Sequence, residues 1–126
     1  MRKIALEEHC MVPGLASYWE GTMADVPKEI YDRIRARLFD YGEMRLREMD
    51  EAGIGKSILS VAGPGVQVEP NTATALKTAS EANDHLAAQI APNKDRLYAF
   101  AHIALQDANA AAKELERCVK QLGFKG

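Results

Sequence analysis

Three apolar runs alternate with stretches of helical periodicity, and this alternation restricts the fold more than any other feature of the chain. The runs cover residues 3–10, 55–62 and 97–105. Each connecting stretch is long enough for a crossover helix, so the runs are expected to form parallel strands with helices packed on the sheet. Two architectures satisfy this pattern: an open doubly wound sheet and a (β/α)8 barrel.

The connecting stretches carry the caps and breakers that bound helices. Asp25 is the expected N-cap of the first helix, and Asp107 or Asn109 is the expected N-cap of the last. Residues 14–25, between the first strand and the first helix, are expected to form a loop. The first helix is expected to open at residues 26–29, and after an interruption at Gly42 a second helical segment should end at Gly53. A third helix is expected over residues 72–91, and the last helix should end at Gly123.

The length of the chain and its last residues indicate a part of something larger. A barrel typically needs about 250 residues, and 126 residues supply about three of its eight units. Residues 122–126 have the pattern of a helix end followed by the first residues of a fourth strand. We therefore expect residues 1–126 to be the N-terminal piece of a larger α/β protein, with both architectures still open.

The composition excludes several classes of function. Apolar residues make up 47% and charged residues 27%, which is typical of a globular domain and not of a disordered one. Sixteen basic residues face eighteen acidic ones without a basic stripe, so no nucleic-acid partner is expected. No apolar stretch is long enough to span a bilayer. The basic start Met1-Arg2-Lys3 precedes only three apolar residues, which argues against a secretory signal and favours the cytoplasm.

The first strand contains the residues with the most chemical potential, Glu7-Glu8-His9. Side chains alternate between the faces of a strand, so Glu7 and His9 should share one face and Glu8 the other. A carboxylate and an imidazole on one face can bind a single divalent metal ion. At the C-terminal mouth of a barrel, such a pair would lie where barrel enzymes carry out their chemistry.

Four further residues, two cysteines and two histidines, carry reactive or metal-binding side chains. Cys118 lies on an apolar helix stripe and is expected to be a buried small hydrophobe. Cys10 should face away from the metal-binding pair, and a role as ligand or nucleophile is the alternative. His102 lies in the third apolar run, where it is either a core histidine or a contact near the metal. His85 lies off the apolar stripe of its helix and is expected to be solvated.

Motifs along nearly the whole chain carry a family resemblance: residues 3–9, 45–50, 53–54, 58–60, Pro64 with Gln67, 83–84, 95–96, 99–101, 115–119 and 122–124. Together they resemble the metal-dependent, non-oxidative aromatic acid decarboxylases of the amidohydrolase superfamily. The resemblance is closest to the γ-resorcylate, 2,3-dihydroxybenzoate and salicylate decarboxylases. It implies a distorted (β/α)8 barrel of more than twice this length. Residues 1–126 would then be the N-terminal part of a single barrel domain, an α/β fold with the first three βα units and the start of the fourth strand.

The resemblance also implies roles for particular residues. Glu7 and His9 would hold part of a divalent metal site for zinc, manganese or magnesium. Gly63 and Pro64 belong to a loop that would line the substrate pocket. Asp25 occupies a position over that pocket where γ-resorcylate-type relatives have an aromatic residue. The remaining ligands and the proton-donating aspartate of the family would lie beyond residue 126, so no catalytic residue is expected in this chain.

Three functions fit these residues. The first is the N-terminal segment of a decarboxylase of hydroxybenzoate-type acids, whose partner is a small aromatic carboxylic acid. The second is a metal-dependent hydrolase or hydratase of the same superfamily, because one scaffold supports many reactions. The third is an inactive barrel fragment that self-associates. A homo-oligomer is expected in any case, because open parallel edges favour association.

Overall fold

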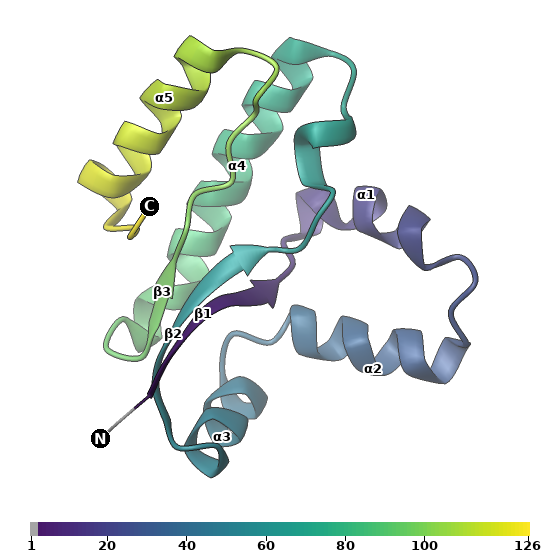
Figure 1. Cartoon of the computed structure of the whole chain (residues 1–126), viewed down its shortest axis with the longest axis vertical. Coiled ribbons are helices and arrows are strands. Elements are labelled where there is room, and N and C mark those ends of the chain that lie inside the picture. Colours follow the sequence, from purple (N-terminus) through teal and green to yellow (C-terminus); the bar gives the residue numbers. More distant parts are fainter. Residues whose placement is uncertain (1–2) are drawn as a thin grey trace.

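The computed structural model describes residues 3–126, so Met1 and Arg2 of the basic start lie outside the described residues. Three parallel strands form one sheet in the order β1 (Lys3–Cys10), β2 (Ile54–Val61) and β3 (Leu97–Ala99), as Figure 1 shows. The sequence therefore predicted the strands, their parallel direction and two of their three lengths. No helix within the described part of the chain is long and apolar enough to cross a membrane.

Within residues 3–126, five α-helices connect or follow the strands. They are α1 (Ala16–Glu20), α2 (Lys28–Leu38), α3 (Glu43–Glu51), α4 (Thr72–Ile90) and α5 (Ala108–Arg117). The expected loop over residues 14–25 is wrong, because α1 and two 3-10 turns, Pro13–Leu15 and Gly21–Met23, occupy it. Burial of Leu15 and Trp19 in the core stabilises this short helical segment, which has too few residues to be stable by propensity alone.

Side-chain caps start two of the helices, and proline starts a third. The Asn71 carboxamide accepts the amide hydrogen of Thr74 at 2.9 Å, and Asp107 caps α5 by accepting that of Ala110 at 3.0 Å. The expectation that Asp25 caps α2 is wrong. The helix begins at Lys28, and the carbonyl of Pro27 accepts its first amide hydrogens, so Asp25 lies too far from the helix to cap it.

The third strand is shorter than expected, with three residues in the ladder instead of the nine of residues 97–105. Beyond Ala99 the backbone of His102 bonds to the Asn83 side chain and not to a strand. Residues 124–126 lie beside this segment: Lys125 donates to the Ala99 carbonyl at 2.9 Å. This contact is the one expected where a fourth strand begins.

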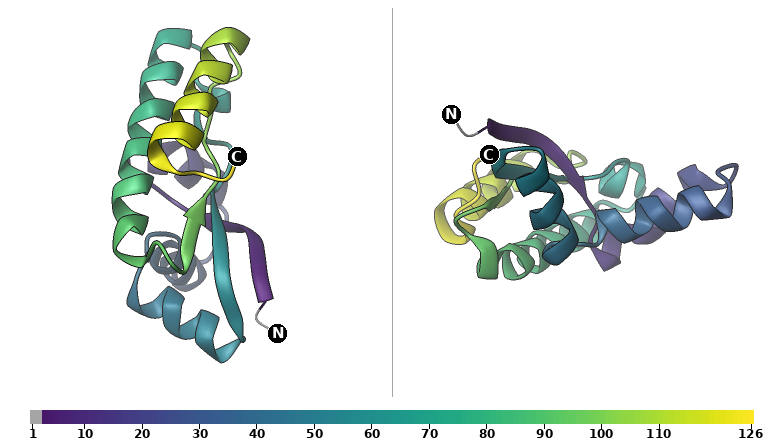
Figure 2. Two further views of the ribbon diagram at one scale, coloured as in Figure 1. Left: turned by 90° about the vertical axis from the view of Figure 1, so that its left-hand side faces the viewer. Right: turned by 90° about the horizontal axis from the view of Figure 1, so that it is seen from below.

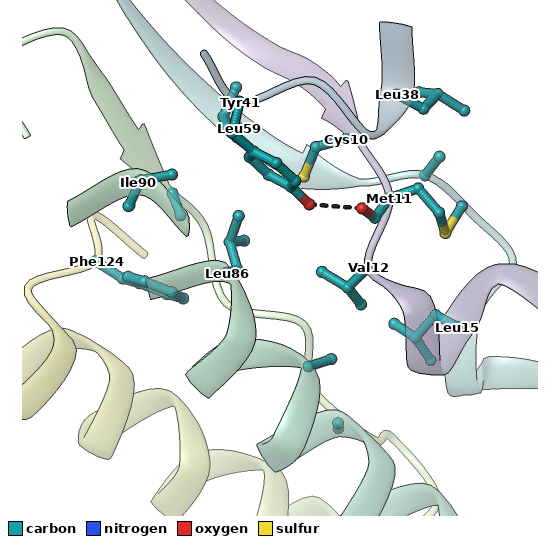
Figure 3. Packing of buried hydrophobic residues seen from close by; sticks show 14 of the residues in the cluster. Cys10, Met11, Val12, Leu15, Leu38, Tyr41, Leu59, Leu86, Ile90 and Phe124 are labelled. Atoms are coloured by element: carbon teal, nitrogen blue, oxygen red, sulfur yellow. Dashed lines mark hydrogen bonds between the residues drawn. The ribbon is translucent and has the colours of Figure 1, made fainter. Parts of the chain in front are cut away.

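The hydrophobic core lies between the sheet and α4. Its centre is formed by residues that follow β1, by β2 and by α4, including Met11, Leu59 and Leu86, all fully buried (Figure 3). Figure 2 shows α4 and α5 side by side on one side of the sheet. The opposite face is uncovered: Ile4 is 62% and Leu6 61% exposed. The side chains on that open face of β1 are therefore available to a ligand or to another element.

Candidate functional site

Glu7 interrupts the regular ladder between β1 and β2. Ala5 pairs with Ser57 and Glu8 pairs with Leu59, so three steps along β1 match two along β2. Glu7 adopts a φ of 55°, and within residues 3–126 it is the one non-glycine residue with a positive φ. A β-bulge with this backbone conformation is strained by about 1–3 kcal/mol, and such strain concentrates at functional sites.

The bulge determines which face of the sheet carries the candidate metal ligands. Ala5 and Glu8 pair with buried β2 residues and therefore point to the helix-covered face. In a regular strand, Glu7 and His9 would share the face of Ala5 and lie beneath the helices. The extra residue reverses this alternation, so both side chains are exposed and Glu8 is half-buried. The pair thus reaches the open face.

A groove of about 360 Å³ lies on the other side of β1, between this strand and helices α2 and α3. Glu8, Arg37, Arg45 and Glu48 are among its lining residues. Arg45 donates to the backbone carbonyl of His9 at 2.9 Å and so fixes the strand from the helix side. His9 also lines this groove, where its carbonyl oxygen accepts from Arg45, whereas Glu7 does not line it.

Glu7 and His9 fit a divalent metal in part. A carboxylate oxygen and an imidazole nitrogen suit zinc or manganese, and both side chains are accessible. Within residues 3–126, no three His, Cys, Asp or Glu side chains lie close enough together to hold a metal ion. These two residues could therefore supply two ligands of a site that needs more.

The predicted substrate loop begins next to the end of β1. Ala62 donates its amide hydrogen to the Cys10 carbonyl at 2.9 Å, which joins the carboxyl ends of β1 and β2. Gly63 and Pro64 follow directly, are joined by a cis peptide bond, and are exposed and half-buried, respectively. The loop therefore lies at the same edge of the sheet as the end of the strand that carries Glu7.

Asp25 is not brought to this edge. It is exposed, and among the described residues it forms no side-chain hydrogen bond or ion pair. It belongs to the connection between α1 and α2, which lies away from the sheet in Figure 1. Trp19 of α1 stacks on Tyr31 of α2 with ring centroids 5.6 Å apart, and this contact holds the two helices together.

The two cysteines lack the properties of nucleophiles. Cys10 and Cys118 are fully buried, as expected for a residue that faces the core and for one on an apolar stripe. Burial raises the pKa of the Cys10 thiol to about 11 and that of Cys118 to about 12. Since the thiolate is the reactive form, the alternative role of Cys10 as a nucleophile is not supported.

The structure adds a residue that sequence reasoning missed, Asn83. It is fully buried and hydrogen-bonds both backbone polar groups of His102. Its position three residues before Leu86 and four after Ala79 places a polar side chain on the apolar stripe of α4, and this irregularity was the available signal. His102 itself is half-buried and contacts the loop after β2, and His85, expected to be solvated, is half-buried.

Comparison with known proteins places these features in a family. Residues 21–126 match the family model described as amidohydrolase. The γ-resorcylate decarboxylase of Rhodococcus jostii is 45% identical over 124 residues, which cover 98% of this chain and 37% of that protein. The chain thus spans well under half the length of this curated relative.

Two solved structures superpose closely on the chain. A dihydroxybenzoic acid decarboxylase from Polaromonas sp., with bound manganese and the inhibitor 2-nitroresorcinol, gives a TM-score of 0.90 at 44% identity, covering 98% of this chain and 36% of that one. A 2,6-dihydroxybenzoate decarboxylase complexed with 2,6-dihydroxybenzoate gives 0.89 at 42% identity, covering 98% and 38%. These superpositions confirm the expected α/β fold: three parallel strands with helices that match the N-terminal part of a TIM-type barrel.

Proposed function

Because the chain belongs to the amidohydrolase family, we propose that it supplies the N-terminal units of a divalent-metal-dependent decarboxylase of hydroxybenzoate-type aromatic acids. The proposal is supported by relatives at 42–45% identity that are named γ-resorcylate decarboxylases. The observation that carries it is the pair Glu7 and His9 on the open face of β1, at the edge where barrel enzymes place their chemistry.

We propose Glu7 and His9 as two of the metal ligands. A bound divalent ion would supply Lewis-acid stabilisation of negative charge on substrate oxygens. Manganese is our first choice among zinc, manganese and magnesium, because a relative was solved with manganese. The bulge at Glu7 holds the carboxylate on the same face as the imidazole, so the two ligands need little reorganisation to bind one ion.

The proposed substrate is a small aromatic carboxylic acid bound beside the loop that contains Gly63 and Pro64. A planar ring can lie against the exposed Gly63 and the half-buried Pro64, because neither presents a long side chain. Asp25 is a weaker candidate for substrate contact, since the described structure leaves it away from the sheet edge. No residue of this chain is proposed as the proton donor.

A hydrolase or hydratase of the same family is the second candidate, because fold alone does not determine the reaction. The decarboxylase names of the relatives favour the first proposal. An inactive, self-associating fragment is the third.

We further propose a homo-oligomer, supported by the exposed Ile4 and Leu6 next to the free edge of β1. We also propose a cytoplasmic location, supported by two cysteines that form no disulfide.

The test is made on the natural polypeptide, whose length is first established by intact mass. It is loaded with Mn²⁺ and assayed for CO2 release from 2,6- and 2,3-dihydroxybenzoate. Glu7→Gln and His9→Ala should each weaken Mn²⁺ binding at least about tenfold. Glu8→Gln is the matched control, because it removes a neighbouring carboxylate that faces the helices, and it should retain Mn²⁺ affinity.

The outcomes separate the reaction from the ligand assignment. A polypeptide that binds Mn²⁺ tightly but releases no CO2 from any hydroxybenzoate contradicts the decarboxylase and favours the hydrolase or hydratase. Unchanged Mn²⁺ affinity in Glu7→Gln contradicts the ligand assignment, whatever the reaction.

A further inference from the structure

The imidazole of His102 contacts the loop that follows β2. Its Nε2 accepts the amide hydrogen of Val66 at 3.1 Å, although the two residues are 36 positions apart. A Cβ added to Gly65 would lie 2.3 Å from Cε1 and 2.4 Å from Nε2 of this ring. The ring therefore occupies the space where any other residue at 65 would place its side chain, and glycine permits this close approach.

The backbone of His102 is held from the opposite direction. Asn83 accepts its amide hydrogen at 2.8 Å and donates to its carbonyl at 2.9 Å. Asn83 also donates to Glu114 on α5 at 2.8 Å, and Arg117 donates to the same carboxylate. Because Asn83 is fully buried and joined to two helices, the Cα of His102 has a fixed position relative to the sheet.

The contact requires a neutral imidazole. Nε2 accepts a hydrogen bond, so in the neutral ring the proton lies on Nδ1. Burial lowers the pKa of His102, which agrees with this form. The acceptor is therefore present at neutral pH without a partner carboxylate.

Two other side chains attach the same loop further along. Gln67 donates to the Ile103 carbonyl at 2.6 Å, and Gln106 donates to the carbonyls of Val66 and Glu69. These contacts hold the end of the loop that leads into α4. The imidazole accepts from the amide of Val66, on the side of this residue that leads back to Gly63 and Pro64, so its removal should loosen residues 63–66 while the contacts of Gln67 and Gln106 remain.

We propose that His102 is a positioning residue that fixes residues 63–66 in the conformation that borders the substrate pocket. The identity of the pocket rests on the proposed function. The order of the loop does not depend on it. His102 acts through the Val66 amide and the space above Gly65. It does not itself bind the substrate.

The loop contact is tested by hydrogen exchange of the Val66 amide, followed by NMR on the full chain. His102→Ala should accelerate this exchange at least about tenfold, since the amide loses its acceptor. His102→Gln should restore most of the protection, because its carboxamide oxygen can reach the position of Nε2. His85→Gln is the matched control and should leave Val66 unchanged. Unchanged Val66 exchange in His102→Ala overturns the proposal, and His102→Leu, which also lacks an acceptor, provides the same comparison if the alanine variant fails to fold.

The role in substrate positioning is tested on the Mn²⁺-loaded natural polypeptide with 2,6-dihydroxybenzoate. His102→Ala should raise KM about tenfold with a smaller change in kcat, and His102→Gln should return KM toward the parent value. Faster Val66 exchange with an unchanged KM overturns the positioning role. A parent polypeptide that releases no CO2 contradicts the proposed function instead, and Val66 exchange then still decides whether His102 orders the loop.

Discussion

Glu8 lies opposite Leu59, the residue that an uninterrupted ladder from Ala5 would pair with Glu7. The inserted residue is Glu7, whose φ of 55° is unfavourable for a side chain with a Cβ. Its carboxylate reaches the open face only because of this insertion. The same backbone conformation that destabilises the strand locally therefore exposes a candidate ligand.

Glu7→Gly should stabilise the chain relative to Glu7→Ala by about 1 kcal/mol, because glycine adopts a positive φ without steric cost. The free energy of unfolding, measured by urea denaturation, checks this difference. The same pair of substitutions at Glu8, where φ is not positive, should give the opposite order. Equal stability of the two Glu7 variants would show that the strain is absent.

Gly65→Ala should destabilise the chain more than Gly53→Ala. Both glycines have a positive φ, 56° and 68°, so both substitutions incur about 1–2 kcal/mol of backbone strain. A Cβ at Gly53 meets nothing within 4 Å, whereas one at Gly65 collides with His102. We expect a total loss near 3 kcal/mol at Gly65.

A double-mutant cycle isolates the collision at Gly65. Adding His102→Ala to Gly65→Ala should recover at least about 1 kcal/mol of the lost free energy of unfolding. Adding it to Gly53→Ala should recover none. Strict additivity at Gly65 would contradict the close contact with the imidazole.

Asn83→Asp should destabilise the chain by about 3 kcal/mol at pH 7, because it removes two buried donor contacts and places a second carboxylate beside Glu114. Part of this loss should be regained near pH 4–5, where one proton can be shared between the two carboxyl groups. Asp84→Asn is the neighbouring control. It weakens only an exposed pair with Arg117 and should cost less than about 1 kcal/mol. A pH-independent loss in Asn83→Asp would contradict the juxtaposition with Glu114.

Acidification should destabilise the chain through His102. Burial holds the pKa of the folded imidazole below its ordinary value of 6.5, so the unfolded chain binds more protons as the pH falls through that value. The contribution of His102 to the free energy of unfolding is complete above pH 6.5 and is lost progressively below it. The free energy of unfolding, measured by denaturation at pH 7.5 and 5.5, should therefore change less between these pH values in His102→Gln than in the parent chain. His85→Gln should show the same change as the parent chain.

Local patterns predicted most of the fold. The second strand was expected at 55–62 and lies at Ile54–Val61, and the long helix expected at 72–91 is α4, Thr72–Ile90. Both have strong periodicity and clear end signals, which depend only on neighbouring residues. The third strand was overestimated because Asn83, a residue of another element, takes the place of a strand partner for His102.

The candidate site was predictable only in part. The spacing of Glu7 and His9 indicated a shared face, but regular alternation would have placed them on the face of Ala5, beneath the helices. The bulge that exposes them has no signal in the local sequence. The contact of His102 with Val66 joins segments 36 residues apart, and no spacing rule extends over that distance.

Met11 donates its amide hydrogen to the carbonyl of Leu38 at 2.9 Å, and the Tyr41 hydroxyl donates to the carbonyl of Met11 at 2.5 Å (Figure 3). The segment that contains α1 and α2 is thus closed at its base by one backbone hydrogen bond and one side-chain hydrogen bond. Doubling the length of a closed loop costs only about 0.6 kcal/mol of chain entropy. Insertions or exchanges at its tip, around Asp25, can therefore accumulate during evolution without disturbing the strands, so that this segment can diversify while the sheet is preserved.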